Sequence, residues 1–508
     1  MSWSKDDPQG AEAAKCKWDI VPFTRGRVLD LGCGPWKCYP HFKGVDSCKD
    51  TELFGIAMNP DYKMECDDLS IFATQSHDGV FSSHLLEHYE YGKVPAVLKE
   101  WMRVIKVGGY MTLYLPDEDE YPKVGEDGAN PDHKWNVNKE RVLECMPDGF
   151  DLIKYEKRNK GYEYSLLFVF KKLGHKARLE SWDKPKPTKT AAVVRYGAFG
   201  DLIQASSILP ALKEQGYHVT MYTVPRGQDV VKADPHIDAW VIQDPDQVPN
   251  NLLKEFWDHE AKKYDKWINL SASVEETLLA VPNKINHTWP HTMRHKYLNE
   301  NYLEFTHNLA EVPMPARPKF YPTSEEREWA KKQRKEIGPS ILYVMTGSSV
   351  HKVWPHMDSL LARIFLKFPH MRVVTVGQEI ETYLEEPWKN EPRVIRKAGK
   401  WSIRQTMAFA QECDIVIGPE TGVLNAVSHE PMRKVCFLSH SSPENLTRDW
   451  VNTAALEPVD TPCYPCHRMH YGWEFCNKSE ETGVALCASN ISVDRAWNAI
   501  EDCLRKAA

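Results

Sequence analysis

The stretch RVLDLGCGPW, residues 27–36, joins a short apolar run to a turn with two glycines. The run fits a buried strand, and Gly32 and Gly34 permit a tight turn that a ligand can approach closely. Apolar runs followed by longer amphipathic stretches recur along the chain, as in AAVVRYG and then ASSILPALKEQ. This alternation predicts parallel sheets with helices on both faces, so ligands are expected at the turns after the strands.

The composition is that of a soluble globular chain and excludes a mainly disordered or fibrous protein. Hydrophobic residues make up 42% of the 508 residues, charged residues make up 27%, and the formal net charge is −7. This negative balance counts against a basic nucleic-acid-binding module. The N-terminal MSWSKDDPQG lacks the features of a signal peptide, and no apolar run reaches the length of a membrane span. We therefore expect a cytoplasmic protein whose thirteen cysteines stay reduced.

Two proline-rich breaks divide the chain. DKPKPTK at 183–189 has two prolines, three lysines and no apolar side chain, which is typical of an extended linker. A second break, VPMPARPKFYPT, contains four prolines. The predicted domains are residues 1–182, 190–320 and 321–508, with 183–189 as the linker.

Acidic residues follow the first three predicted strands. Asp30 ends the first strand, where a carboxylate can take an ammonium group or an ordered water. Asp46, in GVD, can accept both hydroxyls of a ribose, and Asp67 and Asp68, in MECDDLS, can meet an adenine edge. A fourth strand then runs into SSHLLEH. The whole series indicates a nucleoside site more strongly than the glycine pair does by itself.

This series resembles the class I S-adenosylmethionine-dependent methyltransferases, in particular those with LEH after the fourth strand. The resemblance covers about residues 25–172 and includes KVGGYMTLYLPD and PDHKWNVNKERVLECMPDGFDLIKYEK. It implies that S-adenosylmethionine is the cofactor of this domain. The contacts implied for it are the ribose at Asp46, the adenine at Asp67 or Asp68, and the methionine part at Gly32 and Gly34.

The group that takes the proton of the methyl acceptor is less sharply indicated. His84, His88 and His133 are candidates because an imidazole can accept a hydroxyl proton near neutral pH, and we assign catalysis to His88 and His133. The alternative is that these histidines only cap or pack at helix ends. Trp36 replaces the third glycine common in the family, which would alter the methionine pocket. A domain that only binds ligand or assists folding is a further alternative.

The second predicted domain opens on AAVVRYGAFGDLIQASSILPALKEQG, residues 191–216. A strand is followed by a turn with Gly197 and Gly200 and then by a long helix. Asp201 lies near the start of this helix, where the helix dipole and unpaired N–H groups favour a carboxylate. An N-cap aspartate is the alternative interpretation, and the turn lacks the GK[ST] ending of a P-loop.

Three turns of the third domain carry groups suited to phosphates and a ribose. TGSSVHKVWP offers hydroxyls and a lysine for a phosphate, and IGPETGVLNAVSH opens a helix whose N–H groups can bind a diphosphate. VVTVGQEIETYL ends a strand with polar groups that can meet a ribose. The candidate ligand-binding residues of these turns are Ser348, Ser349, Lys352, Gln378, Glu379, Glu420, Thr421 and Gly422.

Residues 190–505 resemble the lipopolysaccharide heptosyltransferases of glycosyltransferase family 9. The resemblance rests on the strand followed by GD and a helix, the lysine-bearing loop, and a turn similar to the family's D-T-G-x-x-H. It implies two Rossmann-like domains facing a cleft, the GT-B architecture, and an inverting transfer that needs no metal. The roles carried over by position are general base for Asp201, stabilisation of the leaving diphosphate for Lys352, Thr421 and Gly422, and ribose binding for Glu379.

Two departures from this family limit what carries over. Glu420 stands where the family has aspartate, and Asn425 stands where it has histidine. The first lengthens a carboxylate arm, and the second removes a titratable donor near the sugar. The donor is therefore expected to be a nucleotide sugar. Analogy with the family favours an ADP-linked donor, and the identity of its sugar stays open.

Four cysteines near the C-terminus have a spacing that can hold a metal. Cys463 and Cys466 form a C-x2-C pair, and Cys476 and Cys487 follow, with His467 and His470 among them. Thiolates at such spacing can bind zinc tetrahedrally. Structural zinc and unligated thiols are the two interpretations, and we assign no metal site from the sequence.

The sequence thus predicts an α/β protein of three Rossmann-like units, a class I methyltransferase domain followed by a two-domain GT-B glycosyltransferase. The predicted function is a bifunctional enzyme that transfers a sugar to an acceptor hydroxyl and methylates the sugar or the acceptor. A carbohydrate or lipid-linked glycan is the expected acceptor, and a modified nucleic-acid base is the alternative. A non-catalytic nucleotide-binding regulatory protein is the alternative of another class. The oligomeric state stays open.

Overall fold

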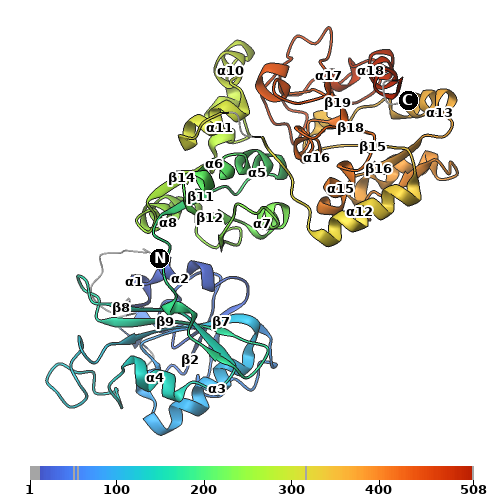
Figure 1. Ribbon diagram of the computed structural model, residues 1–508. Helices are drawn as coiled ribbons and strands as arrows, with labels where there is room; N and C mark the ends of the chain where they lie inside the picture. Colours follow the sequence, from blue (N-terminus) through green and yellow to red (C-terminus); the bar gives the residue numbers. More distant parts are fainter. Residues whose placement is uncertain (1–11, 50–51, 54–55, 315–316, 506–508) are drawn as a thin grey trace. The chain divides into compact units, whose positions relative to one another are not determined.

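The computed structural model describes residues 12–49, 52–53, 56–314 and 317–505 (Figure 1). The chain divides into two compact units. Unit 1 comprises residues up to 188 together with residues 242–263, and unit 2 comprises residues 189–241 and those from 264 onward. In the described parts of the chain, no helix has the length and apolar character needed to cross a membrane.

Unit 1 is built on an eight-stranded sheet of order β10-β8-β9-β7-β6-β1-β2-β5. Strand β1 pairs in parallel with β2 and β6, and β6 pairs in parallel with β7. Strand β9 is antiparallel to both β7 and β8. The strands are Val28–Leu31 (β1), Lys43–Asp46 (β2), Tyr62–Lys63 (β5), His77–Ser83 (β6), Ile105–Pro116 (β7), Phe150–Arg158 (β8), Ser165–Lys172 (β9) and Arg178–Leu179 (β10). A separate antiparallel pair consists of Glu52–Leu53 (β3) and Ile56–Ala57 (β4).

Helices cover this sheet, with α3 and α4 on one side and α1 and α2 on the other (Figure 1). Their bounds are Glu12–Lys15 (α1), Lys17–Ile20 (α2), Val94–Val104 (α3) and Lys139–Cys145 (α4), with 3-10 turns Val21–Phe23 (η1), Leu86–His88 (η2), Tyr91–Lys93 (η3) and Ser181–Asp183 (η4). Apolar residues recur at helical spacing along α3 and are buried, as expected for a helix that packs on a sheet. Trp101 of α3 is fully buried, and its Nε1 donates to the Cys66 carbonyl at 2.7 Å. The largest side chain of this helix therefore enters the core without leaving a polar atom unpaired.

A segment from the middle of the chain completes unit 1. Residues 242–263 lie in the stretch that the sequence assigns to the second domain, and they include Asn250–Leu252 (η5) and Leu253–Ala261 (α8). The fully buried Phe256 of α8 packs on Trp18 of α2, with ring centroids 5.9 Å apart. Gln247 Nε2 donates to the Val21 carbonyl at 2.8 Å. Unit 1 therefore depends on residues far outside its N-terminal segment.

Unit 2 contains two sheets. The smaller has the order β13-β12-β11-β14, and the larger has the order β17-β16-β15-β18-β19-β20 with every neighbouring pair parallel. The smaller sheet consists of Thr190–Val194 (β11), His218–Thr223 (β12), Ala239–Ile242 (β13) and Lys266–Asn269 (β14). The larger consists of Ser340–Val344 (β15), Arg372–Val376 (β16), Val394–Arg396 (β17), Ile415–Pro419 (β18), Arg433–Phe437 (β19) and Thr453–Leu456 (β20). These sheets and that of unit 1 confirm the predicted α/β class.

The helices of unit 2 alternate with these strands, as the sequence pattern predicts. Those associated with the smaller sheet are Phe199–Ser206 (α5), Leu209–Glu214 (α6), Pro225–Val231 (α7), Ser273–Thr277 (α9), Ile285–Thr288 (η6), His291–Leu298 (α10) and Tyr302–Ala310 (α11). The others are Ser324–Ile337 (α12), Val350–Lys352 (η7), Met357–Lys367 (α13), Glu379–Glu381 (η8), Thr382–Glu385 (α14), Glu386–Trp388 (η9), Ile403–Ala410 (α15), Gly422–Ala426 (α16), the π-helical Pro443–Thr447 (η10), Leu486–Ser489 (α17) and Val493–Arg505 (α18).

The two parts of unit 2 are joined by a buried arginine. Arg404 of α15 donates through Nε to Glu326 Oε1 of α12 at 2.6 Å. Its other nitrogens donate to the carbonyls of Asp229, Val230 and Tyr321. Because all of these partners converge on one planar fork, Arg404 fixes α7, α12 and α15 to one another.

We expect Phe256→Ala to destabilise unit 1, although residue 256 lies beyond the predicted linker. Loss of a fully buried phenylalanine costs about 3–5 kcal/mol of unfolding free energy, since a cavity remains. Hydrogen exchange of the β1 and β6 amides in the full chain measures this cost. Glu255→Ala, at an exposed position of the same helix, is the control and should leave exchange unchanged. Equal protection in the wild type and Phe256→Ala would contradict the assignment of this segment to unit 1.

Candidate functional site

A pocket of about 390 Å³ in unit 2 collects most of the residues predicted to act on a nucleotide sugar. Glu379 is not among its lining residues, and the neighbouring Gln378 is. The pocket draws on turns that follow strands of both sheets, as expected for parallel α/β structures. The predicted residues that line it are Asp201, Ser348, Lys352, Gln378, Glu420, Thr421 and Gly422.

Two glycines let the first turns of α5 and α16 meet at this pocket. A Cβ atom at Gly422 would lie 2.8 Å from Phe199 Cβ, and one at Gly200 would lie 2.9 Å from Asn425 Nδ2. Both distances are shorter than real Cβ contacts allow. Asn425, the residue that departs from the family histidine, accepts at Oδ1 a hydrogen bond of 2.7 Å from Gln204. Its amide therefore ties α16 to α5.

Asp201 is held by an arginine that the sequence analysis did not single out. The Arg195 side chain is 1% exposed and donates to Asp201 Oδ2 at 2.6 Å. The same guanidinium donates to both carboxylate oxygens of Glu275 at 3.0 Å. Asp201 remains 22% exposed where it lines the pocket, and only its Oδ2 atom is engaged by Arg195. An arginine at the end of the strand AAVV was the sequence signal for this pair.

Lys352 and Glu420 form the other charged part of the pocket. Lys352 Nζ donates to the backbone carbonyl of Glu420 at 2.7 Å. Burial lowers the pKa of Lys352, while the negative charges of Glu420 and Asp201 act in the opposite direction. The hydroxyl of Thr421 is buried and has no hydrogen-bond partner among the described residues. The lysine and this hydroxyl are thus available to an oxygen-rich ligand.

The Glu420 carboxylate is occupied by the loop that follows β19. Its Oε1 accepts from the backbone amides of Ser439 at 3.0 Å and His440 at 2.8 Å and from the Ser439 hydroxyl, and its Oε2 accepts from the Ser441 amide at 3.3 Å. Burial opposes ionisation, but His440, Lys352 and the Ser439 hydrogen bond hold the pKa of Glu420 well below its usual range. Glu420 therefore fixes this loop with a charged carboxylate.

In unit 1 the glycine turn lies beside the end of β2. Gly32 and Gly34 both have positive φ, 72° and 58°, which only glycine adopts readily. Gly34 N donates to Asp46 Oδ2 at 3.1 Å, and Cys48 N donates to Asp46 Oδ1 at 2.9 Å. The turn and the acidic end of β2 are thus directly linked. Of the predicted adenine contacts, Asp67 and Asp68 are both exposed, and Asp68 accepts from the Ser70 amide at 3.0 Å.

Asp30 is buried at the end of β1. Its Oδ2 accepts a hydrogen bond of 2.7 Å from the Cys38 amide. Burial raises the pKa of Asp30 to about 7, so its carboxyl is poised between the two protonation states at neutral pH. A cationic group placed against it would favour the ionised form.

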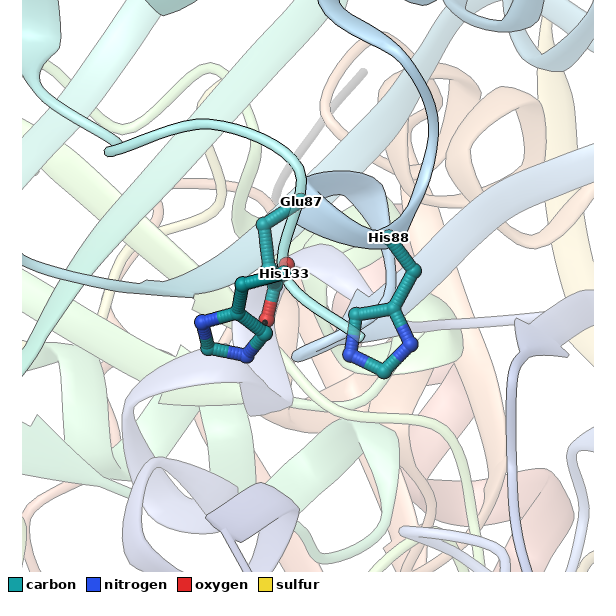
Figure 2. Close-up of side chains that lie close together, drawn as sticks. All are labelled: Glu87, His88 and His133. Atoms are coloured by element: carbon teal, nitrogen blue, oxygen red, sulfur yellow. Dashed lines mark ion pairs between the residues drawn. The ribbon is translucent and has the colours of Figure 1, made fainter. Parts of the chain in front are cut away.

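His88 and His133 come together, and a third residue, Glu87, joins them (Figure 2). The two imidazole rings have centroids 5.3 Å apart. The segment with His133 is fixed to η2, because Lys134 N donates to the Glu87 carbonyl at 2.8 Å. Burial lowers the pKa of His133 to about 4 and also lowers that of His88, so both are neutral near pH 7. His84 contacts Ser165 Oγ at 3.0 Å instead.

Glu87 is the residue of this group that the sequence analysis missed. Its side chain is fully buried, with Oε1 3.5 Å from His133 Nε2. Burial raises the pKa of Glu87 to about 8. The signal was present in LEH, where a carboxylate precedes the histidine directly.

The four C-terminal cysteines line one small pocket of about 30 Å³ together with His470. None of the chain's thirteen cysteines, all of which are described, forms a disulfide. Burial is the main cause that raises the pKa of each of the four, and neighbouring thiols add to it for Cys466, Cys476 and Cys487. The residues present are compatible with either interpretation, unligated thiols or a thiolate metal site.

Comparison with known proteins finds one matching family model and several similar solved structures. Residues 29–113 match the family model of the methyltransferase domain, which confirms that resemblance. Similar solved structures include Escherichia coli ADP-heptose lipopolysaccharide heptosyltransferase II (14% identity, TM-score 0.44, 63% of this chain and 100% of that chain). A glycosyltransferase of family 9 from Veillonella parvula has 16% identity and a TM-score of 0.46 over 63% of this chain and 99% of its own.

Another similar structure is the complex of the Haloferax volcanii Trm112 methyltransferase activator with a methyltransferase. The identity is 15% and the TM-score 0.24, over 32% of this chain and 89% of that chain. No curated protein sequence matches this chain.

We expect Asp30→Asn to weaken the pH dependence of unit 1 stability. The pKa of Asp30 rises from 3.8 to about 7 on folding, so the folded protein holds a proton that the unfolded chain releases within this window. Its contribution to the unfolding free energy therefore falls as the pH rises from about 4 to about 7. Asparagine removes this titration and keeps an oxygen for the Cys38 amide.

Hydrogen exchange of the β1 amides, corrected for the intrinsic rate at each pH, measures how the unfolding free energy of unit 1 changes with pH. Asp148→Asn is the matched control, because Asp148 is 60% exposed and pairs with Arg178 at the surface. Equal slopes for the wild type and Asp30→Asn would show that Asp30 does not titrate in this range.

Proposed function

We propose that the protein is a bifunctional enzyme that transfers a sugar from a nucleotide sugar to an acceptor hydroxyl and methylates the sugar or the acceptor with S-adenosylmethionine. The observation that carries the proposal is the unit 2 pocket, where a carboxylate from one sheet faces the same space as a lysine and a hydroxyl from the other. The acceptor class is a carbohydrate or a lipid-linked glycan.

Glycosyl transfer in this pocket is an inverting displacement that requires no metal. The acceptor oxygen attacks the anomeric carbon from the face opposite the diphosphate, and Asp201 takes the hydroxyl proton. The bond from the anomeric carbon to the diphosphate oxygen breaks, and its electron pair stays with the diphosphate. Arg195 holds Oδ2 of Asp201 at 2.6 Å, which orients the carboxylate and leaves its Oδ1 for the acceptor.

The negative charge that develops on the diphosphate is met by Lys352, by the Thr421 hydroxyl and by the backbone of the α16 turn. Lys352 lies 7% exposed, and a buried cation stabilises an anion more strongly than one in water. The orphaned Thr421 Oγ1 gains a partner when a phosphate oxygen binds. Ser348 and Gln378 line the same pocket and are assigned to the donor. Glu379 is retained as a ribose contact only through the family analogy.

We expect Asp201→Ala to lower the rate of sugar transfer by about 100-fold or more, the usual contribution of a general base. Glu275 still pairs with Arg195 in this variant, so the fold should persist, which thermal unfolding checks. Release of nucleoside diphosphate from a panel of nucleotide sugars and glycan acceptors gives the rate. The control is Asp229→Ala, which removes a half-exposed carboxylate paired with Lys232. Undiminished transfer by Asp201→Ala would refute its role as base.

The residues of unit 1 fit S-adenosylmethionine. A Cβ at Gly32 would lie 2.9 Å from the Leu85 side chain, and its φ is positive, so this tight turn requires glycine. The Asp46 carboxylate uses one bond per oxygen for backbone amides and retains lone pairs for two ribose hydroxyls. The ammonium group of the methionine part suits the buried carboxylate of Asp30. When bound, the cofactor supplies an electrophilic methyl group.

Methyl transfer then needs a group that takes the acceptor proton. His88 and His133 are neutral near pH 7, because burial lowers the pKa of both, and a neutral imidazole has a lone pair to accept that proton. His88 is the more accessible of the two, since His133 is buried. Both therefore stay in the proposal as acceptor-side residues.

We expect Asp46→Asn to weaken S-adenosylmethionine binding by about tenfold, because hydrogen bonds to a charged carboxylate are stronger than those to an amide. Isothermal titration calorimetry with the full chain measures the affinity. Asp127→Asn, at an exposed position of the same unit, is the control and should bind as the wild type does. The absence of binding heat with folded wild-type protein would contradict the methyl-transfer half of the proposal.

A further inference from the structure

Three clusters of histidine and carboxylate side chains have ligand atoms close enough to share a metal ion. Within each cluster the ligand atoms lie within 4.8 Å of one another. The clusters, in the part of the chain that the structure describes, are Glu87, His88 and His133; His351, Glu420 and His440; and Asp19, His259 and Glu260. The clusters differ in whether hydrogen-bond donors or cations already engage the oxygens of the carboxylate.

Two of the clusters already have their carboxylates occupied. Glu420 accepts hydrogen bonds from the Ser439, His440 and Ser441 amides, as described above. Asp19 accepts from Arg158 at 2.6 Å and Lys263 at 2.8 Å. Cations and N–H donors fill the positions that a metal would need, so these clusters are structural.

The Glu87 carboxylate differs from the occupied carboxylates of these two clusters. Its side chain is 0% exposed, and neither carboxylate oxygen has a hydrogen-bond partner among the described residues. A buried carboxylate without partners is costly and requires an explanation. His133 Nε2 lies 3.5 Å and His84 Nδ1 3.7 Å from Glu87 Oε1, both beyond hydrogen-bond length. Direct pairing with these histidines therefore does not satisfy it.

The spacing does suit two ligands of one ion. With bonds of about 2.1 Å, ligand atoms of a tetrahedral zinc site lie about 3.4 Å apart. The 3.5 Å between Glu87 Oε1 and His133 Nε2 matches this, and the His88 ring lies beside them (Figure 2). Two imidazoles and one carboxylate are the ligand set of many zinc and non-haem iron sites.

We propose that Glu87, His88 and His133 bind a divalent transition-metal ion of the zinc type. Three protein ligands leave a coordination position open, as in catalytic sites. Binding requires a deprotonated Glu87 and neutral imidazoles, and the ion supplies the partner that this buried carboxylate lacks. Asp132, whose negative charge acts on both His88 and His133, adds to the attraction for a cation.

The position of this site connects it with the glycine turn. Glu87 and His88 follow β6, which pairs with β1, the strand that leads into Gly32. Leu85, three residues before His88, lies within contact distance of a Cβ placed at Gly32. If unit 1 transfers methyl groups as proposed above, the ion would occupy the imidazole lone pairs and would itself lower the pKa of a hydroxyl bound in the open position.

Zinc titration of the full chain tests the site without any acceptor or cofactor. The protein is freed of metal with a chelator and carries Cys463→Ser and Cys466→Ser, which remove the other candidate ligand set. We expect one zinc equivalent per chain by calorimetry, with affinity weakened at least about 100-fold in Glu87→Gln and in His133→Asn. His175→Asn, at an exposed position of the same unit, is the control and should bind zinc as the parent does.

Cobalt supplies a second readout of the same site. We expect Co²⁺ to give visible d–d absorption without thiolate charge-transfer bands, and Glu87→Gln to lose it while still unfolding at the parent temperature. No zinc equivalent in the parent protein, or equal affinity in the parent and Glu87→Gln, would overturn the proposal. S-adenosylmethionine titration is read separately, so zinc binding without cofactor binding would refute methyl transfer and leave the metal site standing.

Discussion

Both units depend on one geometric constraint, that parallel strands end at the same edge of their sheet. In unit 1 this constraint brings together the turn after β1, the end of β2 and the turn after β6. The first and the last of these lie more than fifty residues apart in the sequence. In unit 2 the same rule is supplemented by the close approach of Gly200 and Gly422, which brings the edges of two sheets to one pocket.

Sequence patterns predicted the features that depend on residues close together in the chain. The strand–turn–helix alternation predicted the α/β class, and five of the expected donor-site residues besides Gln378 line a single pocket together with Asp201. Long-range partners could not be read in this way. Arg195 directly follows the apolar strand AAVV, but its partner cannot be read from the pattern, because Glu275, which shares its guanidinium, lies eighty residues later. The 242–263 segment was missed for the same reason, since its amphipathic pattern does not state which unit it covers.

Glu87 and Glu420 show how the same side chain takes opposite states in two buried places. Four donors from one loop surround Glu420, and the pKa of this carboxyl is held far below its usual range despite burial. No comparable set of donors among the described residues surrounds Glu87, and burial raises its pKa to about 8 although its own backbone amide acts in the opposite direction. The supply of N–H and O–H groups, rather than depth, decides whether a buried carboxylate is a structural anchor or a vacant acceptor.

The return of residues 242–263 to unit 1 affects the order in which the protein is made. During synthesis the first 188 residues leave the ribosome well before the segment with Phe256 and Lys263. At roughly 5–20 residues per second, the Trp18 face and the buried Asp19 wait for some seconds without their final partners. Moreover, the chain passes between the units three times, so a single cut in the linker would not release an intact N-terminal unit. The folding of unit 1 is thus tied to the synthesis of part of unit 2.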